Sequence, residues 1–249
     1  MQRTPRPASA RSKKKQETPK SKKLANAAII GLSALLVAGL GAAFVQDEQA
    51  QARNAESVSS YTPPAVDEAD VEIIRFAAVG DSITEANSPD IVERRVGNAS
   101  WVSYAESKST RYAGGWADGG AQTKAMRENF EAVSNADVLV VLAGANDVAN
   151  DVPFDETTSN ISAIVDEAGT ERVIVSSIPP QSKDPARVVE FNDRLEDFAR
   201  DNGWEWVDAS AELRDGDDFA DGMSEDGVHP TQKGAKVLGD VLQEAIAGK

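Results

Sequence analysis

Short apolar runs alternate with segments of helical periodicity along the C-terminal part of this chain, from residue 71 to residue 249. Each run is shorter than a typical helix and apolar enough to form a strand buried on both faces. The predicted strands are Val71–Val79, Ala136–Ala143, Arg172–Ile178 and Trp204–Val207, with Arg111–Ala113 as a weaker fifth. This alternation predicts an α/β domain with a parallel sheet, right-handed crossovers and helices on both faces.

Four segments have the spacing of amphipathic helices. They are Gln122–Val133, Pro153–Ala168, Pro185–Asp201 and about Pro230–Ala247. The third begins with a proline after an Asp184 cap, which is a common way for a helix to start. Its predicted buried face is Val188, Phe191, Leu195 and Phe198, and that of the last helix is Val237, Leu238, Val241, Leu242 and Ile246.

A second constraint is the apolar run of residues 24–45. As a helix it would be about 33 Å long, enough to cross a bilayer. Lysines and arginines precede it and Asp47 and Glu48 follow it, an asymmetry that puts the N-terminus in the cytoplasm. We therefore expect a basic cytoplasmic head at 1–23, a transmembrane signal-anchor at 24–45, an extracytoplasmic linker at 46–70 and a folded domain at 71–249.

A cleaved signal peptide is the alternative for the same run, because Ala50-Gln51-Ala52 has the small-x-small pattern of a cleavage site. The run is longer than the usual apolar region of a signal peptide, about 15 residues, and this favours the anchor. In both cases the domain crosses the membrane, and it is secreted if the signal is cleaved. The linker is polar, contains Pro63-Pro64 and is expected to act as a tether.

Composition excludes several kinds of chemistry. The chain has no cysteine, so it contains no disulfide, thiol nucleophile or Cys-ligated metal. It has one histidine, His229, which excludes a multi-histidine metal site and makes this residue the sole imidazole for proton transfer. Residues 46–249 carry 17 basic and 40 acidic groups, which argues against nucleic acid as a partner. We expect no metal and no cofactor.

Ligands of a parallel sheet bind at the carboxyl ends of its strands, so the loops after Val79, Ala113, Ala143 and Val207 are where a site is expected. Gly80-Asp81-Ser82-Ile83-Thr84 places a serine hydroxyl and its N–H at that edge, with a helix cap or turn as the alternative. Gly144-Ala145-Asn146-Asp147 supplies an uncharged amide donor that can stabilise negative charge, with an Asx-turn as the alternative.

The last polar segment is Asp226-Gly227-Val228-His229-Pro230. Asp226 can accept a hydrogen bond from one nitrogen of the His229 ring while the other nitrogen faces the site. The alternative is a solvated surface histidine. Nearby acids suggest bound calcium as a further alternative, but no stretch has the ligand spacing of an EF-hand loop. These acids are Asp215, Asp217, Asp218, Asp221 and Glu225.

Together these three segments resemble the conserved blocks of the SGNH (GDSL-type) hydrolase superfamily, in the family's order and over about residues 71–249. The family's second block is a glycine at the end of the second strand or in its loop. Of the candidates between Gly114 and Thr123, Gly120 fits best. Ala86 stands where the first block of the family often has glycine. The resemblance implies a three-layer α/β/α, flavodoxin-like sandwich with about five parallel strands.

The resemblance also implies roles for individual residues. Ser82 would be the nucleophile, His229 the base, and Asp226 the group that holds the imidazole tautomer. The Ser82 N–H, the Gly120 N–H and the Asn146 amide would form the oxyanion hole. Trp101 and Trp116 stand near the first two site loops and either line a sugar or acyl pocket or pack in the core.

The function expected from these features is an extracytoplasmic, membrane-anchored serine esterase that works through an acyl-enzyme. Its partners would be the membrane, through residues 24–45, and a small-molecule or cell-envelope ester, such as an acylated glycan or lipid. An O-acyltransferase using the same three side chains is one alternative. A catalytically silent, tethered glycan-binding module is another.

Overall fold

The computed structural model describes residues 72–248. Five strands form one sheet in the order β2-β1-β3-β4-β5, and every neighbouring pair is parallel. They are β1 (Ile74–Gly80), β2 (Thr110–Ala117), β3 (Val138–Leu142), β4 (Arg172–Ser176) and β5 (Glu205–Val207). This is the flavodoxin-like order, so the predicted parallel sheet is confirmed. The order reverses between β1 and β3, the position at which sheets of this kind bind ligands.

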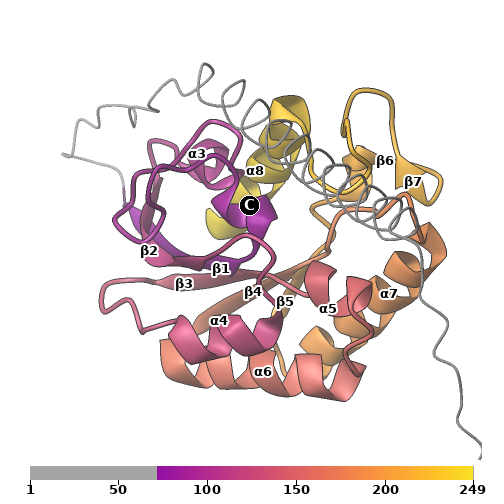
Figure 1. Cartoon of the computed structure of the whole chain (residues 1–249). Helices are drawn as coiled ribbons and strands as arrows, with labels where there is room; N and C mark the ends of the chain where they lie inside the picture. The colour runs from indigo at the N-terminus through magenta and orange to yellow at the C-terminus, as the bar shows by residue number, and fades with distance from the viewer. Residues whose placement is uncertain (1–71, 249) are drawn as a thin grey trace, which may run out of the picture. The chain divides into compact units, whose positions relative to one another are not determined.

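Helices cover both faces of the sheet (Figure 1). One face carries α3 (Val102–Ala105) and α8 (Gln232–Ile246), and the other carries α4 (Thr123–Asn129), α6 (Phe154–Ala168) and α7 (Pro185–Asp201). The short helices α2 (Ser82–Glu85) and α5 (Ala145–Ala149) come directly after β1 and β3. A 3₁₀ turn, η1 (Ala211–Leu213), and an antiparallel hairpin of β6 (Arg214–Asp215) and β7 (Asp218–Phe219) come between β5 and α8 in the chain.

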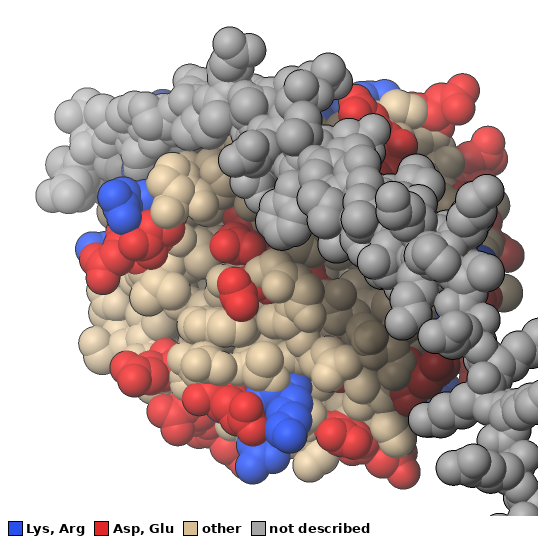
Figure 2. Space-filling view, in the orientation of Figure 1, with Lys and Arg blue, Asp and Glu red and all other residues tan. Residues whose placement is uncertain are grey.

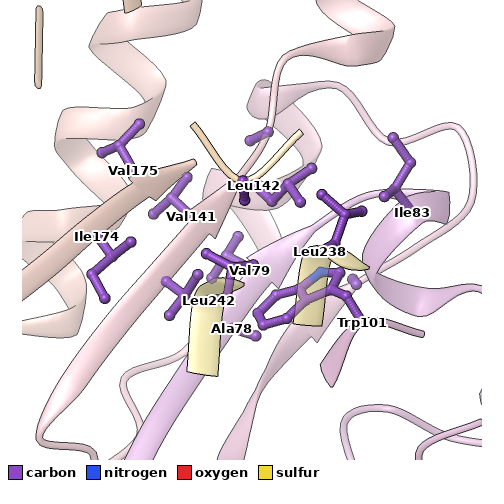
Figure 3. Packing of buried hydrophobic residues seen from close by; sticks show 14 of the residues in the cluster. Ala78, Val79, Ile83, Trp101, Val141, Leu142, Ile174, Val175, Leu238 and Leu242 are labelled. Atoms are coloured by element: carbon purple, nitrogen blue, oxygen red, sulfur yellow. The ribbon is translucent and has the colours of Figure 1, made fainter. Parts of the chain in front are cut away.

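The core lies on both sides of the central strand β3, whose five residues are all buried. On one side, Leu238 and Leu242 of α8 lie beside Ala78 and Val79 of β1 (Figure 3). Full burial of a leucine side chain contributes about 1.5–3 kcal/mol. The core therefore holds β1 and β3 rigidly, and with them the loops that follow these strands.

The two tryptophans near the first site loops pack inward. Trp101 is fully buried beside Phe76, and its indole N–H donates to Thr84 Oγ1 at 3.0 Å. Trp116 is half-buried and packs against the same core. The proposal that Trp101 lines a sugar or acyl pocket is wrong, and the core-packing alternative is correct for it.

Strand β2 is longer than its sequence indicates. The prediction ended at Ala113, but the strand continues through Gly114 and Gly115 to Ala117. A Cβ on Gly115 would lie 2.0 Å from the Ala78 carbonyl oxygen, so glycine is required where β1 and β2 approach. Glycine weakens the strand signal in the sequence although the packing demands it here. The loop that carries Gly120 therefore begins only at residue 118.

Helix α7 has the predicted bounds, but three other helices are shorter than predicted, most of all α4, which ends at Asn129. Asp184 precedes α7, yet its side chain makes no capping hydrogen bond. On the predicted faces, Phe198 of α7 and Val237 and Val241 of α8 are only half-buried. The remaining residues of these faces are buried, namely Val188, Phe191, Leu195, Leu238, Leu242 and Ile246.

The predicted basic head, apolar run and linker, residues 1–70, lie outside the described residues. Within residues 72–248, no helix combines the length and the apolarity needed to cross a membrane.

Candidate active site

The Ser82 hydroxyl stands at the first position of α2, where the chain leaves the carboxyl end of β1. Asp81 caps this helix, because its Oδ1 accepts a hydrogen bond from the Ile83 N–H at 3.0 Å. The helix-cap alternative for this segment is therefore correct for Asp81. The cap fixes the backbone on both sides of Ser82 and leaves its hydroxyl at the sheet edge.

His229 contacts both a serine and an aspartate. Its Nε2 lies 2.9 Å from Ser82 Oγ, and its Nδ1 lies 2.7 Å from Asp226 Oδ2. The side chains of His229 and Asp226 are 49% and 55% exposed. The imidazole is thus open to solvent yet hydrogen-bonded at both nitrogens, so it is not a free surface histidine. The structure brings Ser82, His229 and Asp226 into one hydrogen-bonded chain.

The histidine turn, residues 224–230, is ordered mainly by the carboxylate of Asp226. While Oδ2 faces the imidazole, Oδ1 accepts from the N–H groups of Val228 at 2.9 Å and His229 at 2.8 Å. Burial raises the pKa of Asp226, but the hydrogen bonds from the His229 ring and from these two N–H groups outweigh it and lower the pKa to about 2. Asp226 is therefore ionised at neutral pH and holds the ring in one orientation.

The asparagine turn, residues 144–147, consists of the cap residue Gly144 and the first three residues of α5, which follows β3. The Asn146 Nδ2 donates to Asp81 Oδ2 at 3.3 Å and to the Ala121 carbonyl at 3.1 Å. These acceptors adjoin Ser82 and Gly120, so the structure brings Asn146 to the other site loops. Both amide hydrogens already have acceptors, and the contact with Asp81 is the longer of the two.

The loop after β2 carries Gly120, which is exposed and has a φ of +76°. An open depression of about 450 Å³ lies along this loop and α4, and its lining includes Asp118, Gly120 and Lys124.

Asp147 anchors the asparagine turn from inside the protein. Its carboxylate is buried and accepts from the Thr123 N–H at 2.9 Å, the Thr123 hydroxyl at 2.5 Å and the Thr157 hydroxyl at 3.0 Å. These bonds tie α5 to the start of α4 and to α6. The sequence does not indicate this role, because an acid in a short polar segment that begins with glycine is expected to be solvated.

One of the acidic residues around the hairpin, Asp218, has hydroxyl and N–H partners within the protein. Asp218 Oδ1 accepts from the Ser182 hydroxyl at 2.6 Å and from its neighbour Phe219 N–H at 2.7 Å. Among residues 72–248, no group of three or more metal-ligating side chains is arranged to hold an ion.

Comparison with known proteins agrees with this geometry. Residues 78–237 match the model of the GDSL-like Lipase/Acylhydrolase family, and the matched span includes Ser82, Asn146, Asp226 and His229. The chain belongs to this family. It is accordingly a serine ester hydrolase. A search of curated proteins found no match.

Solved structures support the same fold. A lipolytic protein of the G-D-S-L family from Desulfitobacterium hafniense is similar with a TM-score of 0.58 and 18% identity, over 68% of this chain and 98% of that one. An acylhydrolase from Bacteroides fragilis gives a TM-score of 0.54 and 24% identity, over 79% and 93%. A lipase/acylhydrolase from Enterococcus faecalis gives 0.53 and 20%, over 71% and 96%. At these identities the similarity shows the fold alone.

Asp81 is a second acid of this hydrolase that the sequence analysis did not single out. It is fully buried, and burial raises its pKa to about 6, although the Ile83 N–H and the charge of His229 act in the opposite direction. A carboxyl group beside Asn146 therefore titrates close to neutral pH.

Asp81 is expected to make the folded hydrolase less stable as pH rises. Its pKa is about 6 in the folded protein, against an ordinary aspartate value of 3.8, so the stabilising proton is present below about pH 4 and lost as pH rises through 6. Between pH 4 and pH 7.5 the stability of Asp81→Asn relative to wild type should rise by about 2 kcal/mol. Urea unfolding of both proteins at the two pH values measures this, and an unchanged difference would contradict it.

Proposed function

We propose that this hydrolase is a membrane-anchored, extracytoplasmic serine esterase with Ser82, His229 and Asp226 as its catalytic triad. The observation that carries the proposal is the continuous chain of hydrogen bonds from Ser82 Oγ through the imidazole to the Asp226 carboxylate. In such a chain the aspartate fixes the tautomer that leaves Nε2 free to accept a proton.

The reaction would begin with attack of Ser82 Oγ on the carbonyl carbon of the ester, while His229 Nε2 takes the hydroxyl proton. The imidazolium then gives this proton to the leaving alcohol as the C–O bond breaks and the acyl-enzyme forms. Water attacks the acyl-enzyme with His229 again as base, which releases the acid and restores Ser82.

The negative charge of the tetrahedral intermediate would be stabilised by the Ser82 N–H, the Gly120 N–H and the Asn146 amide. Asn146 can take this role by exchanging its long 3.3 Å contact with Asp81 for the oxyanion, while its bond to Ala121 stays in place. Because the Asp81 carboxylate competes for the same amide hydrogen, protonation of Asp81 should make the exchange easier.

We infer a cell-envelope ester, a glycan or lipid, as the substrate, since the N-terminal apolar run would tether the domain outside the membrane. Acidic side chains predominate over basic ones on the face in Figure 2, which makes a polyanionic substrate unfavourable.

Labelling by an active-site probe and hydrolysis of esters together test the proposed function. The full chain in detergent should react with a fluorophosphonate probe at Ser82 and hydrolyse esters in a panel from acetyl to long-chain acyl groups. Faster transfer of the acyl group to an added sugar hydroxyl than to water would instead identify an O-acyltransferase. Absence of both labelling and turnover would support a silent binding module.

The membrane topology gives a separate prediction. Protease added to intact cells or spheroplasts should digest residues 46–249, and the chain should stay in the membrane pellet after a salt wash, because a spanning helix is not released by ionic strength. Protection of the domain from protease would overturn the extracytoplasmic assignment. A mature chain that begins near Arg53 would replace the anchor by a cleaved signal.

A further inference from the structure

Two adjacent residues in the loop after β4 contact two separate turns of the site. The Gln181 Nε2 donates to the Ala145 carbonyl, in the asparagine turn, at 2.8 Å. The Ser182 N–H donates to the Gly227 carbonyl, in the histidine turn, at 2.8 Å. One dipeptide thus joins the turn that carries Asn146 to the turn that carries the imidazole.

The loop that presents this dipeptide is itself held at two points. At its start, the backbone N–H and carbonyl of Ile178 bond to the Asn192 side chain of α7 at 2.9 and 3.0 Å, and Pro179 and Pro180 are buried. Within the dipeptide, the Ser182 hydroxyl donates to the Asp218 carboxylate of the hairpin. The dipeptide is therefore attached to a rigid part of the protein.

The histidine turn also fits directly against Ser182. Gly227 has a φ of +76°, a conformation that favours glycine, and a Cβ there would lie 2.7 Å from Ser182 Oγ. Only a glycine allows this close packing of the turn on the loop.

We propose that Gln181 and Ser182 are positioning residues that hold the asparagine turn and the histidine turn at a fixed separation. The inference rests on the proposed function, in which the imidazole and the Asn146 amide act on one carbonyl group from opposite turns. A misplacement of about 1 Å between such groups can cost about 100-fold in rate. The dipeptide acts through the two turns and needs no contact with the substrate.

Gln181→Glu tests the first contact with little change in side-chain shape. It replaces the amide donor by an oxygen that faces the Ala145 carbonyl, so the asparagine turn should shift. We expect kcat to fall about tenfold, with KM changed by less than about twofold. If the effect passes through Asn146, the same substitution made in Asn146→Ala should change kcat by less than about twofold.

Ser182→Ala tests how firmly the residue that makes the second contact is anchored to the hairpin. It removes the bond to Asp218 but keeps the backbone bond to Gly227, so we expect a smaller fall in kcat, about threefold. This loss should be the same with or without Asn146→Ala, because it passes through the histidine turn. Lys183→Ala is the matched control, since Lys183 is the exposed next residue of the same loop; its kcat should equal that of wild type.

Comparing each substitution with and without Asn146→Ala separates a positioning role from a general loss of folded structure. Equal losses for Gln181→Glu in both backgrounds, or full activity in the wild-type background, would overturn the proposal. Thermal unfolding checks that each variant is folded, and Gln181→Met repeats the test if Gln181→Glu is not. A wild-type chain that fluorophosphonate does not label overturns the proposed function and this inference with it, whereas a labelled chain with an unaffected Gln181 variant overturns only the inference.

Discussion

Ser82→Ala should reduce kcat by about 10⁴-fold or more, because it removes the oxygen that would form the acyl-enzyme. The rate that remains is what substrate binding and the oxyanion donors supply without a nucleophile. Ester hydrolysis at saturating substrate measures the loss, and fluorophosphonate labelling should disappear in the same variant. Because the side chain lies on the surface edge of the sheet, the core beneath it is not altered.

Stability separates this result from misfolding. The lost hydrogen bond to a half-exposed imidazole contributes about 1 kcal/mol at most, so Tm should fall by no more than about 4 °C. Ser162→Ala, on α6, is the matched control and should keep full activity. A Ser82→Ala protein that retains more than about a tenth of wild-type kcat would contradict the assigned nucleophile.

The apolar pattern of the sequence predicted those strands that are buried on both faces, because burial alone decides their residue types. A central strand covered on both faces must be apolar throughout, and β3 reads VLVVL. The same rule failed at β2, where close approach to the β1 backbone selects Gly115 and a φ of +137° favours glycine at Gly114, although glycine is a poor strand former. Pro185 fixed the start of α7, whereas α4 has no comparable signal after Asn129 and ends earlier than its pattern suggests.

The sequence indicated those site residues for which the chemistry allows few residue types. A single histidine three residues after an aspartate, and a serine after a buried strand, are few enough in this chain to be singled out, and the structure joins them. The contacts that hold these residues in place were not predictable from the sequence. The Gln181 contact crosses 36 residues of chain and the Asn146 contact with Asp81 crosses 65, so neither leaves a local pattern.

Burial of polar groups was the other signal missing from the sequence. Asp81 directly precedes Ser82, and Asp147 directly follows Asn146. Both acids stand in segments whose residues are typical of solvated turns, yet both carboxylates are buried. Only the tertiary fold shows that Thr123 and Thr157 satisfy Asp147, or that Asp81 is desolvated enough to titrate near neutral pH. The pH behaviour of the site therefore follows from the packing around these acids.

Asp226→Asn should lower kcat by about 10⁴-fold at neutral pH because it reverses the tautomer of His229. Oδ1 of the side chain would keep its bonds to the N–H groups of Val228 and His229, which leaves the new amide NH₂ facing Nδ1. Nδ1 must then accept, the ring proton moves to Nε2, and Nε2 can no longer take the proton of Ser82.

The sole histidine makes this reversal directly observable. In a chain purified without a histidine tag, ¹⁵N chemical shifts of the ring report one imidazole, and Asp226→Asn should exchange the protonated nitrogen from Nδ1 to Nε2. Asn146→Ala is the matched comparison: loss of one oxyanion donor should lower kcat by about 10²–10³-fold while the tautomer stays as in wild type. A tautomer that changes in Asn146→Ala, or one that does not change in Asp226→Asn, would mean that the two roles are wrongly assigned, because within residues 72–248 the hydrogen-bond partner of Nδ1 is the Asp226 carboxylate.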